Sequence, residues 1–251
     1  MTGASGGLGR EIALELARQG ARVLLLARRE EKLRAVAEEI GGLGGGGSAE
    51  IVVGDVTDPT VRRAVLERVQ TVFGGLDILV NNAGVGTLAR FETSDPKVTR
   101  QVFETNFFAP VDLTREGLPL LKVGQKPIIV NIGSVVGHRG MPQNSDYGAS
   151  KFALRGWSES LRVELASSGI DVLLVSPGST VTEFWENLAV KDFEVPWSLK
   201  AALPADVTAR AVVRAIAKGK REIIPGLQPR IFVWLARLFP RFTDRILKRF
   251  A

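Results

Sequence analysis

The sequence of 251 residues predicts one α/β domain built on a doubly wound parallel sheet with helices on both faces. Short runs rich in Val, Ile and Leu recur between stretches of helical period, a rhythm that argues against repeats or a second domain. Most of these runs are continuously apolar instead of alternating with polar residues, which is typical of strands covered on both faces. With 45% hydrophobic residues, the chain can also bury a sizeable core.

Six apolar runs are the expected strands, and they lie at residues 23–27, 51–53, 78–80, 128–132, 172–175 and 222–224. A first helix carries an apolar stripe that ends before a glycine C-cap at Gly20; the stripe consists of Ala13, Leu14, Leu16 and Ala17. A second helix carries Leu33, Val36, Ala37 and Ile40, and a flexible glycine-rich connector follows it at 41–48. A third is expected to begin at Asp58 and Pro59, because proline is favoured in a first turn.

Composition excludes several classes of protein. The chain has no cysteine and a single histidine, His138, so disulfides, thiolate zinc sites, cysteine nucleophiles and a histidine-rich metal site are all excluded, and we expect no metal. Neither a signal segment nor a stretch of eighteen apolar residues is present, so neither secretion nor a membrane span is indicated. We therefore expect a cytoplasmic enzyme.

The net charge of +6 is concentrated at one end of the chain. Residues 226–251 hold six basic side chains and Asp244, which together contribute +5, so the remaining body is near neutral. This distribution does not support a nucleic-acid surface spread over the domain, and it defines a basic tail at 226–251.

The tail is also apolar on one side. Four apolar residues recur at helical spacing opposite the basic ones: Phe242, Ile246, Leu247 and Phe250. Such a helix can lie in a lipid interface as a peripheral anchor, or it can pack against a neighbouring subunit; membrane contact is our preferred interpretation.

The opening stretch "TGASGGLG" has the pattern of a phosphate-binding loop. Gly3, Gly7 and Gly9 allow a tight turn, a close approach of the backbone to a pyrophosphate, and close packing of the helix that begins near Arg10. The alternative is a plain turn that leads into a helix. The pair Arg28 and Arg29 ends the first predicted strand, where a Rossmann-type fold selects its cofactor. An arginine there favours the 2′-phosphate of NADP(H), unless both arginines merely solvate a loop.

The stretch "SVVGHRGMPQNSDYGASK" follows a predicted strand and runs into a helix, which places Tyr147 and Lys151 on one helix face. The Lys151 ammonium would favour the phenolate form of Tyr147 near neutral pH, as a proton-transferring tyrosine requires. Ser134, at the end of the preceding strand, can donate to a substrate carbonyl oxygen. These three residues are our candidate catalytic group.

These motifs occur in the order and spacing of the short-chain dehydrogenase/reductase family, which the chain resembles from residue 2 to about residue 225. "TGASGGLG" resembles the family's glycine motif, "DV" at 55–56 its adenine contact, and "NNAG" at 81–84 its motif after the fourth strand. Asn106, Ser134, Tyr147 and Lys151 resemble its catalytic residues. "PG" at 177–178 with Thr182 resembles its nicotinamide-side loop.

The resemblance implies a Rossmann-type fold and hydride transfer between NADP(H) and a small-molecule carbonyl or alcohol. Tyr147 would be the general acid/base, Lys151 would lower its pKa and hold the nicotinamide ribose, Ser134 would orient the substrate, and Asn106 would support a proton relay. The implied cofactor-binding residues are Gly3, Ser5, Gly7, Leu8, Gly9, Arg28, Asp55, Val56, Asn82, Ala83, Gly84, Tyr147, Lys151, Pro177, Gly178 and Thr182. The family also implies a homodimer or homotetramer. A cofactor-binding module without turnover, or a truncated inactive chain, remain alternatives.

We divide the chain into a dinucleotide-binding domain at 1–225, with a substrate lid at about 179–203, and the tail at 226–251. The lid is long and carries four aromatic residues, namely Phe184, Trp185, Phe193 and Trp197, which favour a bulky apolar substrate if they do not simply pack on the body. His138 is interpreted as a loop residue at the pocket rim, with substrate contact as the alternative.

In the resembled family the glycine loop follows a central first strand, and this sequence has no residues for one before Met1. Buried backbone groups without partners cost roughly 1–3 kcal/mol each. We therefore expect a strand upstream, with Met1 standing at the position of its last residue, and greater solubility and activity in a version extended by it.

Overall fold

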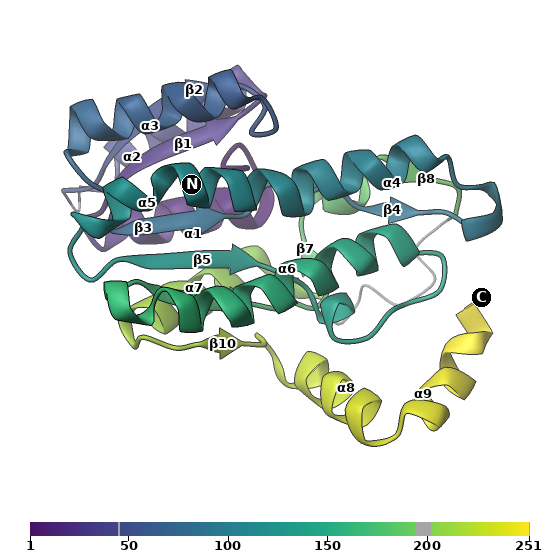
Figure 1. The fold of residues 1–251 in the computed structure, drawn as a ribbon. Helices are drawn as coiled ribbons and strands as arrows, with labels where there is room; N and C mark the ends of the chain where they lie inside the picture. Colours follow the sequence, from purple (N-terminus) through teal and green to yellow (C-terminus); the bar gives the residue numbers. More distant parts are fainter. Residues whose placement is uncertain (45, 194–201, 251) are drawn as a thin grey trace.

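The computed structural model describes residues 1–44, 46–193 and 202–250, and its parallel strands with helices on both faces confirm the predicted fold class (Figure 1). The strands that form the central layer are β1 (Arg22–Ala27), β2 (Ser48–Val53), β3 (Ile78–Asn81), β5 (Ile128–Ile132), β6 (Asp171–Val175) and β10 (Glu222–Ile223). β2 pairs with β1, and β3, β5, β6 and β10 follow one another in that order. Each of the six predicted strands is thus present within three residues of its expected bounds.

The N-terminal residues join the two parts of this layer. The Met1 amine donates to the carbonyl oxygen of Leu24 at 2.9 Å, and the Leu26 amide donates to that of Met1 at 2.9 Å. On the other side, the Thr2 amide donates to the carbonyl oxygen of Val80 at 3.0 Å. Met1 and Thr2 therefore lie between β1 and β3 as the end of a strand would, and they lead directly into the glycine loop.

Helices cover the sheet in two layers (Figure 1). One face holds α1 (Gly7–Arg18), α2 (Glu30–Gly41) and α7 (Ala205–Ala217), and the other holds α3 (Pro59–Phe73), α5 (Ala109–Lys122) and α6 (Ser145–Glu164). The predicted stripes of α1 and α2 pack against the first face, with Ile12 and Leu33 fully buried. α3 begins as predicted, because the Asp58 carboxylate accepts from the Thr60 amide at 2.7 Å.

Shorter elements lie in the connections between these strands and helices. The helical ones are α4 (Pro96–Phe103), the π-helix η2 (Glu104–Phe108), and the 3-10 turns η1 (Phe91–Thr93), η3 (Val135–Gly137), η4 (Ala166–Ser168) and η5 (Glu183–Trp185). Two-residue strands pair β4 (Thr87–Leu88) with β8 (Val190–Lys191), and β7 (Thr180–Val181) with β9 (Leu203–Pro204). The β4–β8 pairing ties the predicted lid to the segment after β3, and the β7–β9 pairing joins the two ends of the lid.

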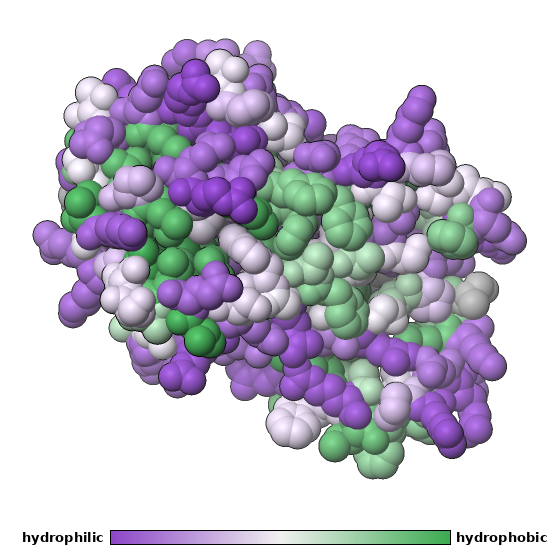
Figure 2. Space-filling view, in the orientation of Figure 1, coloured by the Kyte–Doolittle hydropathy of each residue, from purple (hydrophilic) through white to green (hydrophobic). Residues whose placement is uncertain are grey.

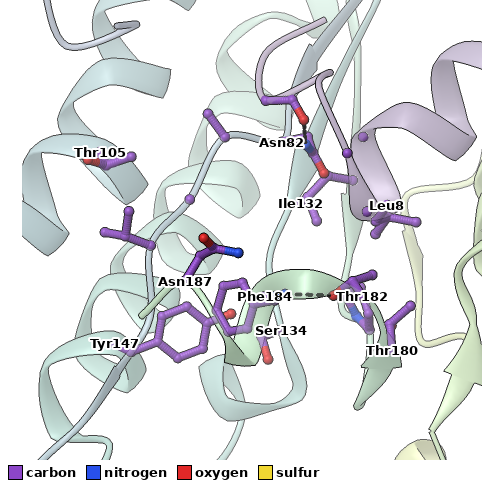
Figure 3. Close-up of a pocket in the computed structure, with 18 of the residues that line it drawn as sticks. Leu8, Asn82, Thr105, Ile132, Ser134, Tyr147, Thr180, Thr182, Phe184 and Asn187 are labelled. Carbon is purple, nitrogen blue, oxygen red and sulfur yellow. Dashed lines mark hydrogen bonds between the residues drawn. The ribbon is translucent and has the colours of Figure 1, made fainter. Parts of the chain in front are cut away.

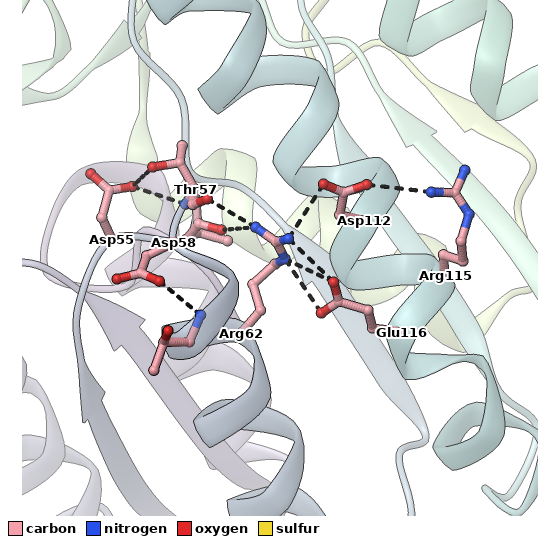
Figure 4. A network of polar contacts seen from close by, with 9 residues as sticks. Asp55, Thr57, Asp58, Arg62, Asp112, Arg115 and Glu116 are labelled. Carbon is pink, nitrogen blue, oxygen red and sulfur yellow. Dashed lines mark hydrogen bonds and ion pairs between the residues drawn. The ribbon is translucent and has the colours of Figure 1, made fainter.

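A buried arginine anchors the loop after β2 (Figure 4). Arg62 of α3 is 6% exposed and donates to the carbonyl oxygens of Val56 and Thr57 at 3.2 and 3.0 Å. Its guanidinium also meets the carboxylates of Asp112 and Glu116 on α5, at 3.3 and 3.2 Å. Because a buried charge needs partners on every side, this network holds the loop against both helices.

The C-terminal tail forms α8 (Leu227–Leu238), α9 (Pro240–Leu247) and the 3-10 turn η7 (Lys248–Phe250). Val233, Ala236 and Leu247 are buried, so within the apolar stripe predicted for 242–250 Leu247 is buried while Phe242 and Ile246 are exposed. The exposed apolar residues of the tail are Leu227, Ile231, Trp234, Leu235, Leu238, Phe239, Phe242 and Ile246. None of the helices within the described part of the chain is long and apolar enough to cross a bilayer.

Candidate active site

A cavity of about 870 Å³ lies at the carboxyl ends of the strands, between the glycine loop and the predicted lid (Figure 3). Every predicted catalytic and cofactor-binding residue lines it except Asn106. Since parallel strands carry their following loops at the same edge, residues more than 170 positions apart meet here. No group of carboxylate, imidazole or thiol side chains that could hold a metal ion is found among the residues that the structure describes.

The glycine loop forms a tight cradle at one end of the cavity. Gly3 and Gly7 have φ angles of 65° and 54°, which side chains other than glycine rarely adopt. A Cβ on Gly3 would lie 2.8 Å from Asn82 Nδ2, and one on Gly7 would lie 3.2 Å from the Thr182 side chain. α1 begins at Gly7, so the positive end of its dipole lies at this loop, as a pyrophosphate requires. The cradle therefore fits a dinucleotide.

The second predicted motif, after β3, holds the cradle in place. The Thr2 hydroxyl accepts from the amides of Asn82 and Ala83, both at 3.0 Å. Asn82 Nδ2 in turn donates to the carbonyl oxygens of Thr2 and Gly3, at 3.0 and 3.2 Å. Asn82 thus supports the loop instead of reaching into the cavity with a free amide.

Three cations lie at the end of the cavity beside β1. Arg28 is paired with Asp55 at 3.6 Å, and its side chain is 70% exposed. Arg29 Nε donates to the Ser5 hydroxyl at 3.2 Å, and both Arg29 and Lys32 meet the carboxylate of Glu183. The predicted arginine pair therefore lines the cavity beside the glycine loop, and Lys32 shares the Glu183 carboxylate with Arg29.

The candidate catalytic group meets at the other end of the cavity. Tyr147 is 8% exposed, and its hydroxyl is hydrogen-bonded to that of Ser134. Lys151 Nζ lies 5.6 Å from the centre of the Tyr147 ring and donates to the carbonyl oxygen of Ile132 at 2.8 Å. The sequence spacing thus predicted this cluster, one helix turn apart on α6.

The ionisation of Tyr147 differs from the expectation drawn from the sequence. Burial raises the pKa of Tyr147 to about 12, and the hydrogen bond from Ser134 only partly opposes it. Burial also lowers the pKa of Lys151 to about 8. The prediction that Lys151 lowers the pKa of Tyr147 is therefore wrong for this structure, because burial is the largest cause of the shift and the one cause that opposes it is the hydrogen bond with Ser134. At neutral pH the phenol keeps its proton.

Asn106 lies behind the cavity, 1% exposed, in the π-helix η2. Its Oδ1 accepts from the Val85 amide at 2.8 Å, while Nδ2 donates to the Val85 carbonyl oxygen at 2.9 Å and to the Ser150 hydroxyl at 3.0 Å. Both ends of its amide are thereby engaged in holding the loop after β3. Its predicted part in a proton relay rests on the resemblance alone.

The lid covers the cluster with aromatic side chains (Figure 3). The Phe184 ring lies 5.6 Å from the Tyr147 ring and 5.3 Å from that of Trp185, and both lid residues line the cavity. Phe193 instead packs under the guanidinium of Arg90, 5.3 Å away, and does not line the cavity. The fourth predicted ring, Trp197, lies outside the described residues.

His138 is buried and does not line the cavity, so the structure supports neither its predicted position at the pocket rim nor the alternative of substrate contact. Nε2 lies 2.9 Å from the Ser176 hydroxyl and 3.3 Å from a Glu222 carboxylate oxygen. Nδ1 lies 3.1 Å from Arg237 of α8. His138 therefore links the loop after Ser134 to the tail.

The tail contributes to the cavity, which the sequence analysis missed. Phe232 of α8 lines it, and Pro229 packs so closely on Gly178 that a Cβ there would lie 2.6 Å from Pro229 Cγ. Other lining residues outside the predicted set include Gly6, Gln101, Glu104, Thr105, Met141, Asn144, Glu183 and Asn187. The signal that could have indicated this role was the apolar character of the tail. We interpreted it only as an outer surface for a membrane or a neighbouring subunit.

The sequence and fold of the chain match known proteins. A family model described as short chain dehydrogenase matches residues 1–192. The uncharacterized oxidoreductase YxnA of Bacillus subtilis (strain 168) is 33% identical, over 99% of this chain and 70% of that protein. The 11-beta-hydroxysteroid dehydrogenase-like protein 4A of Arabidopsis thaliana is 35% identical, over 99% of this chain and 83% of that protein.

Two solved structures share the architecture. An alcohol dehydrogenase from the archaeon Thermococcus sibiricus, complexed with 5-hydroxy-NADP, matches with a TM-score of 0.79 and 26% identity, over 89% of this chain and 93% of that one. A short chain dehydrogenase/reductase from Burkholderia phymatum, in complex with NAD, matches with a TM-score of 0.84 and 23% identity, over 97% of this chain and 93% of that one. At that identity the second match shows the fold alone.

Proposed function

Because the chain belongs to the short-chain dehydrogenase family, we propose that it is an oxidoreductase that moves a hydride between NADP(H) and a carbonyl or secondary alcohol, with Tyr147 as general acid/base. The observation that carries the proposal is the cluster of Ser134, Tyr147 and Lys151, buried at the inner end of a cavity whose outer end is a phosphate cradle. A module that only binds cofactor would not need this cluster.

Ser134, Tyr147 and Lys151 would each have a separate role in carbonyl reduction. Ser134 donates to the substrate oxygen and keeps it beside the phenol, where negative charge develops. Tyr147 then gives its proton to that oxygen. With a pKa of about 12, the phenol is fully protonated at neutral pH and can act as the acid. Lys151, whose Nζ lies 5.6 Å from the centre of the Tyr147 ring, would hold the nicotinamide ribose. The bound nicotinamide supplies the hydride.

The choice of NADP(H) over NAD(H) is supported by charge. Arg28, Arg29 and Lys32 gather at the adenosine end of the cradle, where a 2′-phosphate needs cationic partners. Gly3, Ser5, Gly7, Leu8 and Gly9 would hold the pyrophosphate. The remaining predicted contacts would be Asp55 and Val56 to adenine, Ala83 and Gly84 along the ribose, and Pro177, Gly178 and Thr182 beside the carboxamide.

The substrate is proposed to be apolar and bulky, since Phe184, Trp185 and Phe232 line the cavity and the Phe184 ring packs on that of Tyr147. A panel of aldehydes and ketones of increasing size, followed by NADPH oxidation, tests the function. We expect turnover with NADPH and a preference for large apolar ketones. No oxidation of NADPH with any substrate, by a protein that still binds it, would favour the cofactor-binding module.

The Phe184→Ala variant tests the apolar pocket directly. Burying an aromatic ring contributes about 1.5–3 kcal/mol, so we expect KM for large ketones to rise by roughly ten-fold or more and KM for small ones to change little. Phe91→Ala is the matched control, because Phe91 is 82% exposed and outside the cavity. Equal effects of Phe184→Ala on small and large ketones would contradict a role in substrate size.

The tail is proposed to contact an anionic membrane surface, as a peripheral attachment. α8 and α9 present apolar side chains between hydrophilic ones on the face seen in Figure 2, and the tail carries most of the net charge. We expect the protein to float with anionic vesicles, and the Trp234→Ser, Leu238→Ser double variant to lose most of this binding. Both residues are over 60% exposed, so the fold is retained.

The competing interpretation of the tail is a contact within a homodimer or homotetramer. If the double variant floats like the wild type but elutes as a smaller species, the tail is a subunit contact. The comparison uses the full-length chain, because removal of the tail would also remove Phe232 from the cavity.

A further inference from the structure

One carboxylate of the predicted lid, that of Glu183, contacts two cations at the proposed cofactor end of the cavity. Glu183, the first residue of η5, accepts from Arg29 at 2.9 Å and from Lys32 Nζ at 2.8 and 3.0 Å. These cations hold the pKa of Glu183 down, at about 2, so the group is ionised throughout the neutral range. The contact joins positions 151 and 154 residues apart in the sequence.

The carboxylate lies at the phosphate cradle itself. Arg29 Nε donates to the Ser5 hydroxyl at 3.2 Å, so its guanidinium lies against the glycine loop. A Cβ on Gly6 would be 2.9 Å from an Arg29 terminal nitrogen and 3.8 Å from Glu183 Oε2. Glu183 therefore places an anion where two cations meet a loop suited to phosphate.

The same short turn reaches the reactive end. Thr182 packs on Gly7, its hydroxyl accepts from the Phe184 amide at 3.3 Å, and the Phe184 ring packs on that of Tyr147. Figure 3 shows Thr182, Phe184 and Tyr147 side by side across the cavity. Glu183 is thus directly followed in the chain by the residue whose side chain covers Tyr147.

We propose that Glu183 is an internal stand-in for the 2′-phosphate of the cofactor, and that displacement of its carboxylate from Arg29 and Lys32 is a step in the selection of NADP(H). The inference rests on the proposed function. The three side chains are 43–46% exposed, and exposed ion pairs are weak, so a phosphate with more charge and more acceptor oxygens can displace the carboxylate. A cofactor without the 2′-phosphate leaves the contact in place.

The test measures binding, by calorimetry, of two fragments to the full-length protein: adenosine 2′,5′-bisphosphate and adenosine 5′-monophosphate. In the Glu183→Gln variant the bisphosphate no longer competes with a carboxylate, and we expect its Kd to fall about five-fold, while that of the monophosphate stays unchanged. The control is Glu186→Gln, which removes the same charge from the same turn, at a residue with no ion pair among the described residues. We expect it to alter neither Kd.

Several outcomes would overturn the inference: an unchanged or weaker bisphosphate Kd in Glu183→Gln, equal tightening of both fragments, or the same tightening in Glu186→Gln. Binding of intact NADPH and NADH to the wild type separates this failure from that of the function. A wild type that binds neither cofactor refutes the proposed function as well. A wild type that binds NADPH while Glu183→Gln changes nothing refutes the displacement alone.

Discussion

Replacing Tyr147 by phenylalanine is expected to lower kcat for ketone reduction by about a thousand-fold, because general acid catalysis by a positioned side chain contributes roughly 10²–10⁴-fold. The substitution removes one hydroxyl and leaves the buried ring against Phe184. Steady-state kinetics of NADPH oxidation measures the loss. The Kd for NADPH, measured by calorimetry, should remain close to that of the wild type.

The Ser134→Ala variant is compared with Tyr147→Phe, because we expect it to lower kcat by a smaller factor. The Ser134 hydroxyl is hydrogen-bonded to Tyr147 and also accepts from the Val136 amide at 3.3 Å, so its loss should reduce kcat less than loss of the phenol does. A Tyr147→Phe enzyme with kcat within a few-fold of the wild type would refute the assignment of the acid.

The pH dependence of the same residue follows from its buried position. Because the pKa of Tyr147 is raised from 10 to about 12 on folding, its contribution to stability is full below pH 10 and is lost as the pH rises from 10 to 12. Lys151 acts with the opposite sign: its pKa falls from 10.5 to about 8, so the unfolded chain binds more protons between those values and stability rises with pH there. The pH dependence of the free energy of unfolding therefore contains the contributions of both Tyr147 and Lys151.

Phenolate absorbance separates them, since Tyr147 is the one tyrosine of the chain. A titration of the cofactor-free protein is expected to show little phenolate below pH 10 and a midpoint near the folded pKa of about 12. A midpoint below the ordinary value of 10 would instead support the expectation from the sequence, in which Lys151 makes the phenol acidic.

The sheet and the place of the catalytic cluster could be predicted because their signals are local. Continuous apolar runs mark strands covered on both faces, and a spacing of four places Tyr147 and Lys151 together on any helix. Pro59 after Asp58 marked the start of α3 in the same way. Each of these inferences depends only on residues that are close in the sequence, so it can be made without knowledge of the fold.

What the sequence could not reveal depends on distant contacts. The pKa of Tyr147 is set mainly by how completely the fold excludes water, which the four-residue spacing to Lys151 does not reveal. Glu183 meets Arg29 across 154 residues, and Phe232 reaches the cavity because Pro229 docks on Gly178. In a tail with apolar residues on several sides, periodicity does not tell which of them faces the protein.

The Gly9→Ala variant in the glycine loop is expected to lose both stability and cofactor binding. A Cβ on Gly9 would overlap the carbonyl oxygen of Gly3 and lie 2.5 Å from Asn82 Nδ2, and neither can give way, because Asn82 holds Thr2 and Gly3 by hydrogen bonds. We expect a loss of about 1–3 kcal/mol in the free energy of unfolding from overpacking. Cofactor binding should be lost with it, since the displaced backbone is the cradle itself.

Gly156→Ala is the matched control, with an expected effect of opposite sign. Gly156 lies exposed inside α6, where an added Cβ would meet no atom within 4 Å, so alanine should stabilise the helix by about 0.5–1 kcal/mol. Urea unfolding measures both variants, and calorimetry with NADPH measures the cradle. If Gly9→Ala unfolds like the wild type and binds NADPH with the same Kd, the close approach of α1 to the loop after β3 is not what shapes the cofactor site.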